Sequence, residues 1–207
     1  MSFFEPPPPP PEPPEEHRQP AWIGPPENEL GVAVPLRRVL FRSDDLAIAL
    51  LGVVAFSNGV ELQVVMRRRE ISIEPDPMLF HMRGRHATGG ELAPEVFRFG
   101  VEYADGRKAT NLGNPFSMLA GDEEPTVPVL MERGGGGGGR SWSFGYWLWP
   151  LPPPGPLRVV VEWPVAGVPL TDVELDGAVL IAAAAEADVL WPGDEPSGGS
   201  RSRSYMP

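Results

Sequence analysis

Residues 45 to 69 read DLAIALLGVVAFSNGVELQVVMRRR, and this stretch decides the fold class of the chain. Two apolar runs meet at Ser57, Asn58 and Gly59, and from Val60 onward hydrophobic residues alternate with polar ones. An Asn-Gly pair between such runs predicts a type I′ hairpin turn, because both residues adopt positive φ at low cost. The stretch therefore predicts two antiparallel strands with one buried face.

Similar patterns recur along the chain. We expect strands from about 32 to 42, 46 to 56, 60 to 69, 97 to 103, 107 to 111, 127 to 132, 141 to 149 and 157 to 163, with a second hairpin turn at Asp105-Gly106. The run 46 to 56 is apolar throughout, which is typical of a central strand covered on both faces. Short strands separated by turn residues predict a mainly β protein, an antiparallel two-sheet β-sandwich of immunoglobulin-like or jelly-roll type.

One short helix is predicted near the C-terminal end of the sandwich. Asp176 is a suitable N-cap for it, and residues 178 to 190 are rich in alanine. The stripe expected to face the core is Leu180, Ile181, Ala184 and Ala185. A strand over residues 179 to 183 is the alternative, because β-branched residues lie nearby. In the helical interpretation, Trp191 packs beneath the helix.

Composition divides the chain into a tail, a domain and a second tail. Residues 1 to 30 carry six glutamates and a proline tract at 6 to 14, and residues 193 to 207 show no hydrophobic periodicity. Neither segment has enough apolar surface to offset the entropy of ordering, so both are expected to be disordered. The β-sandwich domain is expected to span residues 31 to 192, with Trp22 and Ile23 as the tail residues suited to dock on it.

Charge and composition narrow the functional classes. The formal net charge is −11, and nucleic-acid binding is not expected of so acidic a chain because it depends on clustered cations. The absence of cysteine excludes disulfides and thiolate metal sites. The longest apolar run, 46 to 56, is far shorter than the ~20 residues of a membrane-spanning helix, and the first residues lack the pattern of a signal peptide. We therefore expect a soluble cytoplasmic protein without membrane association.

No motif indicates catalysis or a cofactor. The six glycines at 134 to 139 lead into a strand rather than a helix and lack the Gly-Lys-Ser/Thr of a phosphate loop, so they are expected to form a flexible hairpin loop. His81 and His86 lie five residues apart, with Asp76 or Glu91 as further potential ligands, and solvated loop histidines are preferred over a metal site. The sequence predicts no catalytic residue, no metal and no cofactor.

Three features are candidates for binding a partner. Arg67 and Arg69 are expected to share one end of the sandwich with Arg42, as a basic patch for an acidic partner or for the chain's own glutamate-rich tail. The alternative is that these arginines are charged strand ends that keep sheet edges from pairing. The proline tract is suited to dock as a polyproline II helix in an aromatic-lined groove of a partner protein, or else serves as a solvated spacer.

The third candidate is an aromatic strand. Trp142, Trp147 and Trp149 fall on both faces of the strand at 141 to 149. Exposed rings would form a platform for a carbohydrate or a peptide, whereas buried rings would enlarge the core of a small sandwich. We prefer the core interpretation.

The two hairpins, the segment WLWPLPPPGPL at 147 to 157 and the Glu162-Trp163-Pro164 that follows resemble uncharacterised bacterial proteins from GC-rich genomes. This resemblance implies no activity, cofactor or site. The function expected from the sequence is that of a non-catalytic interaction or structural module. A carbohydrate- or peptide-binding sandwich that uses the aromatic strand is the alternative, and the oligomeric state stays open.

Overall fold

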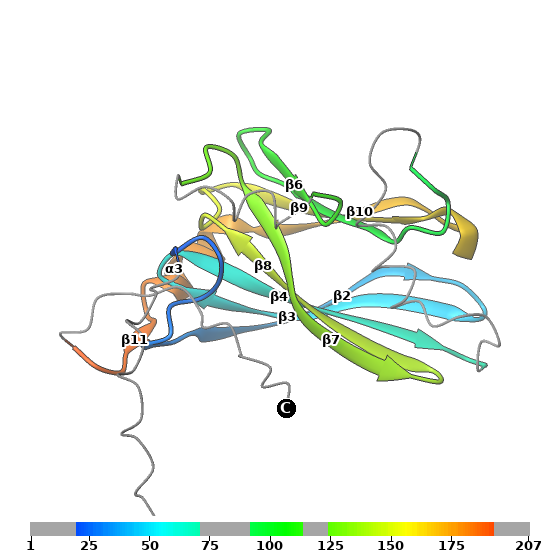
Figure 1. Ribbon diagram of the computed structural model, residues 1–207, viewed down its shortest axis with the longest axis horizontal. Coiled ribbons are helices and arrows are strands. Elements are labelled where there is room, and N and C mark those ends of the chain that lie inside the picture. The colour runs from blue at the N-terminus through cyan, green and yellow to red at the C-terminus, as the bar shows by residue number, and fades with distance from the viewer. Residues whose placement is uncertain (1–19, 71–91, 114–123, 193–207) are drawn as a thin grey trace, which may run out of the picture.

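The computed structural model describes residues 20 to 70, 92 to 113 and 124 to 192. In these residues the chain forms two packed antiparallel sheets, with a helix at one end (Figure 1). The predicted mainly β, two-sheet sandwich is confirmed, and the choice between immunoglobulin-like and jelly-roll strand orders stays a prediction. The predicted disorder of residues 1 to 19 and 193 to 207 lies outside the described residues.

The larger sheet has the order β2-β3-β4-β8-β7 and consists of β2 (Val32–Arg42), β3 (Leu46–Phe56), β4 (Gly59–Arg68), β7 (Val129–Gly138) and β8 (Ser141–Trp149). The smaller sheet has the order β10-β9-β5-β6 and consists of β5 (Arg98–Glu102), β6 (Lys108–Thr110), β9 (Pro156–Trp163) and β10 (Val168–Asp176). A short ribbon pairs β1 (Glu29–Leu30) with β11 (Asp188–Val189). The helical elements are η1 (Pro164–Ala166), between β9 and β10, and α3 (Gly177–Ala184).

Both predicted hairpins are present, but the turn in the first differs from the prediction. Phe56 pairs with Gly59, so Ser57 and Asn58 form the turn. Neither Asn58 nor Gly59 has positive φ, so the predicted type I′ turn is wrong. Gly59 is required for space instead, because a Cβ there would lie 2.6 Å from the carbonyl oxygen of Leu148. In the second hairpin, between β5 and β6, glycine does supply a left-handed turn residue, with φ of 84° at position 106.

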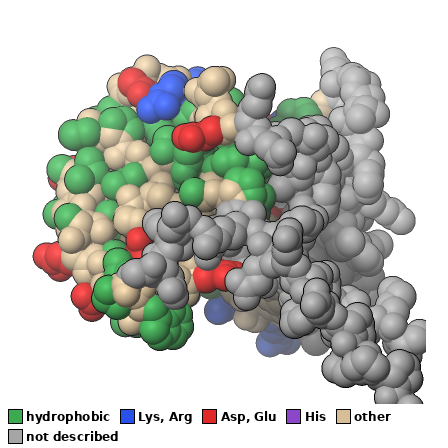
Figure 2. All heavy atoms as spheres, turned by 60° about the vertical axis from the view of Figure 1, so that its left-hand side comes forward, with side chains coloured by type: hydrophobic (Ala, Val, Ile, Leu, Met, Phe, Trp, Pro, Cys, Tyr) green, Lys and Arg blue, Asp and Glu red, His purple; other side chains and the backbone are tan. Residues whose placement is uncertain are grey.

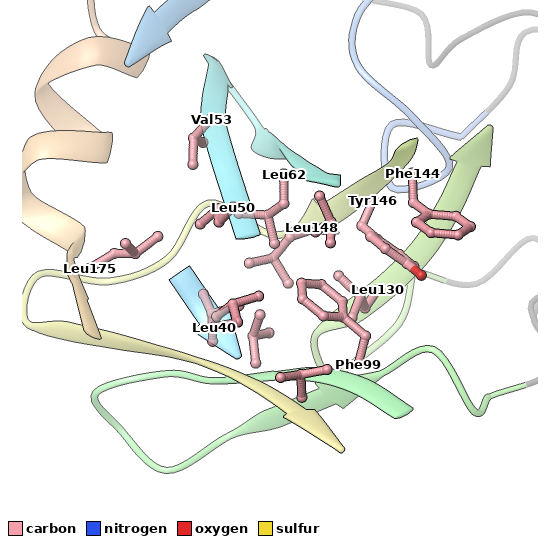
Figure 3. Packing of buried hydrophobic residues seen from close by; sticks show 14 of the residues in the cluster. Leu40, Leu50, Val53, Leu62, Phe99, Leu130, Phe144, Tyr146, Leu148 and Leu175 are labelled. Atoms are coloured by element: carbon pink, nitrogen blue, oxygen red, sulfur yellow. The ribbon is translucent and has the colours of Figure 1, made fainter. Parts of the chain in front are cut away.

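The core lies between the two sheets. Leu62 and Val64 of β4 point to the same interior, as the alternation of the sequence requires. Figure 3 shows Leu62 and Tyr146 of the larger sheet directed toward Phe99 of the smaller one, and the rings of Phe99 and Tyr146 stack with centroids 4.5 Å apart. Fully burying a side chain of this size contributes about 1.5–3 kcal/mol, so the interface between the sheets dominates the stability of the fold.

The outer face of β3 is less covered than expected. β3 is an interior strand of its sheet, between β2 and β4, and its inward residues Ile48 and Leu50 are fully buried. On the other side, Leu51 is 46% exposed and Val54 is half-buried. The prediction that both faces are covered is therefore wrong for the described residues, because the smaller sheet packs on one face of β3 alone.

The glycine run is a strand, so the predicted flexible loop is also wrong. Residues 134 to 138 belong to β7 and pair with β8, from Gly134 opposite Gly145 to Gly138 opposite Ser141. The turn that follows is tight and uses the left-handed φ of 62° at Gly139. The hairpin of β7 and β8 forms one edge of the larger sheet (Figure 1).

Trp142 explains why glycine is suited to this strand. A Cβ at Gly137 would lie 2.2 Å from the carbonyl oxygen of Ser141 and 2.8 Å from the indole ring of Trp142. A Cβ at Gly135 would likewise lie 3.0 Å from the ring of Phe144. The rings of Phe144 and Trp142 therefore lie where side chains at positions 135 and 137 would be, whereas the Cβ positions of Gly134, Gly136 and Gly138 are open.

Residues 20 to 30 form an ordered arm and not the end of a disordered tail, so the expected boundary at residue 30 does not hold. Trp22 and Ile23 are buried in a second apolar cluster on the outer face of the larger sheet. The other buried members of this cluster are Val129, Met131, Trp147 and Trp149. Asn58 holds the arm at the first hairpin turn, since its side-chain nitrogen donates a hydrogen bond of 2.8 Å to the carbonyl oxygen of Ala21. Apolar burial and this hydrogen bond together order the arm.

The helix α3 begins where the sequence predicts. A side-chain oxygen of Asp176 accepts a hydrogen bond of 2.9 Å from the backbone N–H of Ala178, which is an N-cap interaction. The helix ends at Ala184 and not at residue 190, because the following residues extend and pair with β1. Trp191 is 59% exposed, so the expectation that it packs beneath the helix is wrong.

Candidate interaction surfaces

The tryptophans of the aromatic strand lie inside the molecule. Trp142, Trp147 and Trp149 are 3%, 0% and 8% exposed. Trp142 belongs to the core between the sheets, while Trp147 and Trp149 lie beneath Trp22 and Ile23 of the arm. A binding platform requires exposed ring faces, and the faces of these rings are covered by neighbouring side chains.

The arginines of the predicted basic patch do meet at one end of the larger sheet. The register places Arg42 opposite Ala47, Ala47 opposite Arg67, and Arg67 opposite Ser141. Arg42 and Arg67 therefore lie on one face, two strands apart, which corresponds to about 10 Å. Arg69 follows at the same end, where its backbone N–H donates a hydrogen bond of 2.8 Å to the carbonyl oxygen of Asp45.

The side chains of Arg67 and of its neighbour Arg68 make contacts within the fold itself. The guanidinium of Arg67 donates hydrogen bonds to the carbonyl oxygens of Met66 and Trp142, at 2.9 and 3.1 Å. The guanidinium of Arg68 lies 3.9 Å from a carboxylate oxygen of Asp45 and 5.7 Å from the centre of the Trp163 ring. These contacts favour the interpretation of charged strand ends that close the end of the sandwich.

The outer face of the smaller sheet carries charges of both signs. Arg158 of β9 donates hydrogen bonds to Glu102 at 2.7 Å and to Asp172 at 3.0 Å, and so links the strands on either side of it. The hydrogen bond from Arg158 lowers the pKa of the Asp172 carboxyl below its usual value. Arg98 and Glu162 form a second ion pair between β5 and β9. Because the charges neutralise each other and face solvent, this surface is an ordinary solvated face of a sheet.

A different surface lies where the two ends of the described chain meet. Its members are large hydrophobic residues with high exposed fractions, namely Leu30 (59%), Val189 (50%), Leu190 (46%) and Trp191 (59%). We call these four residues the terminal patch. The β1–β11 pairing and a backbone hydrogen bond of 2.7 Å from Leu190 to Asn28 hold them together.

The terminal patch belongs to the end of the sandwich that carries α3 and β11, on the left of Figure 1. Figure 2 brings this end forward and shows more hydrophobic than charged side chains over the described part of the face. Sequence reasoning missed this patch because it assigned Trp191 to the core. The available signal was the apolar run from Val189 to Trp191 directly beside a polar, glycine-rich tail.

The remaining predictions concern residues that the structure does not describe, a metal site, or a helix that crosses a membrane. The proline tract at 6 to 14, His81 and His86 are not described by the structure. Among residues 20 to 70, 92 to 113 and 124 to 192, no cluster of His, Asp or Glu is arranged to hold a metal ion. No helix in these same ranges is long and apolar enough to cross a membrane.

Comparison of the chain with protein-family models, with curated proteins and with solved structures finds no match. The terminal patch is therefore interpreted from its own geometry.

Proposed function

We propose that this chain is a non-catalytic interaction module of the cytoplasm, which binds a protein partner through the terminal patch. The observation that carries the proposal is the exposure of four large hydrophobic residues, two on one short ribbon and two directly after it. Single exposed hydrophobic residues are normal on protein surfaces, but several of them gathered in one short segment pair are typical of an interaction site.

The ribbon itself supports this interpretation. β1 and β11 have two residues each, and a two-stranded pair of this length contributes little stability of its own. Neighbouring residues of a strand point to opposite faces, so Val189 and Leu190 expose apolar surface on both sides of the ribbon. A partner that covers the ribbon would bury both sides and stabilise the ribbon at the same time.

Trp191 is the residue best suited to anchor such a partner. It is the exposed member of the six tryptophans of the chain, all of which lie in the described residues. A tryptophan buried at an interface contributes a large apolar area with little conformational entropy to lose. The partner expected from this chemistry is a protein segment with an apolar stripe that receives the indole ring.

The proline-rich tail is a second element of the proposal. Only residues 15 to 19 separate the tract at 6 to 14 from Pro20, where the described arm begins. A polyproline II segment rises about 3.1 Å per residue, so the tract is within reach of a partner bound on the same end of the domain. In this proposal the tail adds a contact to the same partner and the terminal patch provides the anchor.

The test is capture of a partner from the native host by the full chain. Replacing Trp191→Ala together with Leu190→Ser should abolish the capture, because both changes remove apolar surface that is already exposed in the free chain. Val165→Ala is the matched control, since Val165 is 56% exposed in η1, away from the ribbon. Deletion of residues 1 to 19 should weaken the capture without abolishing it. A partner that is lost with the tail alone and tolerates the Trp191 variant would contradict the assignment of the anchor.

A further inference from the structure

We propose that Asn58 is a site of spontaneous chemical modification, and that its deamidation releases the arm of residues 20 to 30 from the larger sheet. Asn58 is followed by Gly59 and lies in the turn between β3 and β4. A glycine after an asparagine leaves the peptide nitrogen between them open to reaction, because no side chain shields it. The fold requires glycine here, since a Cβ at Gly59 would lie 2.6 Å from the carbonyl oxygen of Leu148. The packing of the sheet and the attachment of the arm therefore create this reactive pair.

The reaction consumes only water. The backbone nitrogen of Gly59 attacks the side-chain carbon Cγ of Asn58 and forms a cyclic imide. The side-chain nitrogen leaves as ammonia, and it takes up the proton that the backbone nitrogen loses. Water then opens the imide at either carbonyl and leaves aspartate or isoaspartate at position 58. Both products carry a carboxylate in place of the neutral amide, and nothing is oxidised or reduced.

The docked arm restrains the amide of Asn58. Its Nδ2 donates a hydrogen bond of 2.8 Å to the carbonyl oxygen of Ala21. Its Oδ1 is buried and, among the described residues, accepts no hydrogen bond. Cyclisation requires a side chain that is free to bring Cγ onto the backbone nitrogen, and it requires access for water. We therefore expect the reaction in the minor population of molecules whose arm has opened.

The product opposes return of the arm. A carboxylate at position 58 has no hydrogen to donate, so the carbonyl oxygen of Ala21 would face a second acceptor. Glu29 adds a like charge, since its carboxylate accepts hydrogen bonds from the backbone N–H and the hydroxyl of Ser57, the other residue of the turn. The buried oxygen that already lacks a donor would also become part of a charged group, which burial disfavours strongly. Deamidation thus acts in one direction.

Opening of the arm changes two surfaces. Trp22 and Ile23 would leave the outer apolar cluster and uncover Trp147 and Trp149. The arm also continues into β1, so the pairing of β1 with β11 would weaken. This second change would separate Leu30 from the rest of the terminal patch. Deamidation would then limit the lifetime of the partner-binding surface, a consequence that rests on the proposed function.

The first experiment incubates the full chain in mildly alkaline buffer and maps its peptides by mass spectrometry. The expected product is aspartate and isoaspartate at position 58. Asn111 is the internal control, because both ends of its amide are hydrogen-bonded and the side chain of Leu112 shields the following nitrogen. Trp22→Ala should speed the reaction about tenfold or more by loosening the arm. Leu92→Ala, at a half-exposed position outside the arm, should leave the rate unchanged.

Hydrogen exchange measures the arm directly. The backbone N–H of Leu190 is the reporter, since it donates to the carbonyl oxygen of Asn28 in the arm. Asn58→Ala should speed its exchange about fivefold through the loss of one hydrogen bond, and Asn58→Asp about fivefold further through the added charge. The backbone N–H of Gly106, in the second hairpin, should exchange at the same rate in all three chains.

Three results would overturn the proposal. The first is deamidation at Asn58 that is no faster than at Asn111. The second is an equal rate in the Trp22→Ala and Leu92→Ala chains, and the third is equal exchange of the Leu190 reporter in the Asn58→Asp and Asn58→Ala chains. Both readouts are made on the chain alone, so their failure is distinct from a failure of the proposed partner binding.

Discussion

Gly59 lacks a side chain because the neighbouring strand β8 leaves no room for one. Its Cβ position lies within 2.6 Å of the Leu148 carbonyl oxygen and 2.7 Å of the Trp147 ring. Gly138, at the far end of β7, has nothing within 4 Å of its Cβ position. The same residue type thus serves close packing at one position and leaves open space at the other.

These two glycines should respond oppositely to alanine. Gly59→Ala should lower the free energy of unfolding by about 1–3 kcal/mol through overpacking. Gly138→Ala should raise it slightly, by at most about 1 kcal/mol, because alanine restricts the unfolded chain and meets no neighbour in the folded one. Urea denaturation of both variants is the measurement. A destabilisation that is equal at the two positions would contradict the assigned packing.

Tyr103 is a titratable residue of the core. Burial raises the pKa of its phenol well above the usual value near 10, and its hydroxyl donates a hydrogen bond to the carbonyl oxygen of Pro150. Because the folded state favours the neutral phenol, this residue adds stability at every pH below the unfolded pKa. That stability is lost as the pH rises above about 10.

Tyr103→Phe tests this dependence. At neutral pH the variant should be less stable by about 0.5–1.5 kcal/mol, the typical contribution of one hydrogen bond. Above about pH 10 the stability of the unchanged chain should fall more steeply than that of the variant, since phenylalanine cannot ionise. Denaturation midpoints measured from pH 7 to alkaline pH give both quantities. Parallel curves would show that Tyr103 ionises equally in the folded and unfolded states.

Among the elements, those with a local alternating pattern were predictable from the sequence. β4 and β9 alternate apolar residues with mostly polar ones, the first half of β8 alternates large rings with small residues, and each strand is found at the expected place. β10 was not predicted, because a register shift after Val168 breaks its alternation. The first part of β7 was expected as a strand, but its glycine run was assigned to a loop because glycine has low strand propensity; the rings that leave no room for side chains at Gly135 and Gly137 belong to a different strand.

The helix α3 shows the same division between local and distant causes. Its start was predictable because Asp176 caps it within two residues. Its end was not, because pairing of β11 with β1 joins segments more than 150 positions apart in the chain.

Replacing the cap tests the local part of this account. Asp176→Ala should lower the free energy of unfolding by about 1 kcal/mol, since the backbone N–H of Ala178 loses its acceptor. Asp176→Ser should retain most of the stability, because its hydroxyl can accept the same hydrogen bond. Thermal unfolding of the two variants is the measurement, and equal losses in both would contradict an N-cap role.

For the whole molecule, the arm links the first hairpin turn to the outer face of the larger sheet. Asn58 bonds to the arm through Ala21, and Ser57 bonds to it through Glu29, whose carboxylate accepts the backbone N–H at 3.0 Å. Trp22 fills the apolar cluster between these contacts.

Of the candidate surfaces, the grouping of arginines at one end of the larger sheet was predictable, because it follows from strand register. The terminal patch was not, because sequence alone does not distinguish the buried Trp22 from the exposed Trp191.

The arm should therefore contribute measurably to stability. Trp22→Ala should lower the free energy of unfolding by about 3–5 kcal/mol, the usual cost of removing a large buried aromatic ring. Leu92→Ala is the control, since Leu92 is 43% exposed and its removal should change stability by less than about 0.5 kcal/mol. Chemical denaturation compares the two. A Trp22 variant as stable as the Leu92 variant would mean that the arm does not pack as described.

The pairing of the glycine run with β8 is the central claim, because the outermost strand of the larger sheet among the described residues depends on it. Nuclear Overhauser spectra of the full chain, recorded in dilute solution, test it most directly. Facing residues of an antiparallel pair that are not hydrogen-bonded to each other bring their Cα atoms to about 4.5 Å. The account predicts strong Hα–Hα contacts between Gly137 and Trp142 and between Gly135 and Phe144, which are paired in the register. Glycine signals with random-coil shifts and no contact to β8 would contradict it.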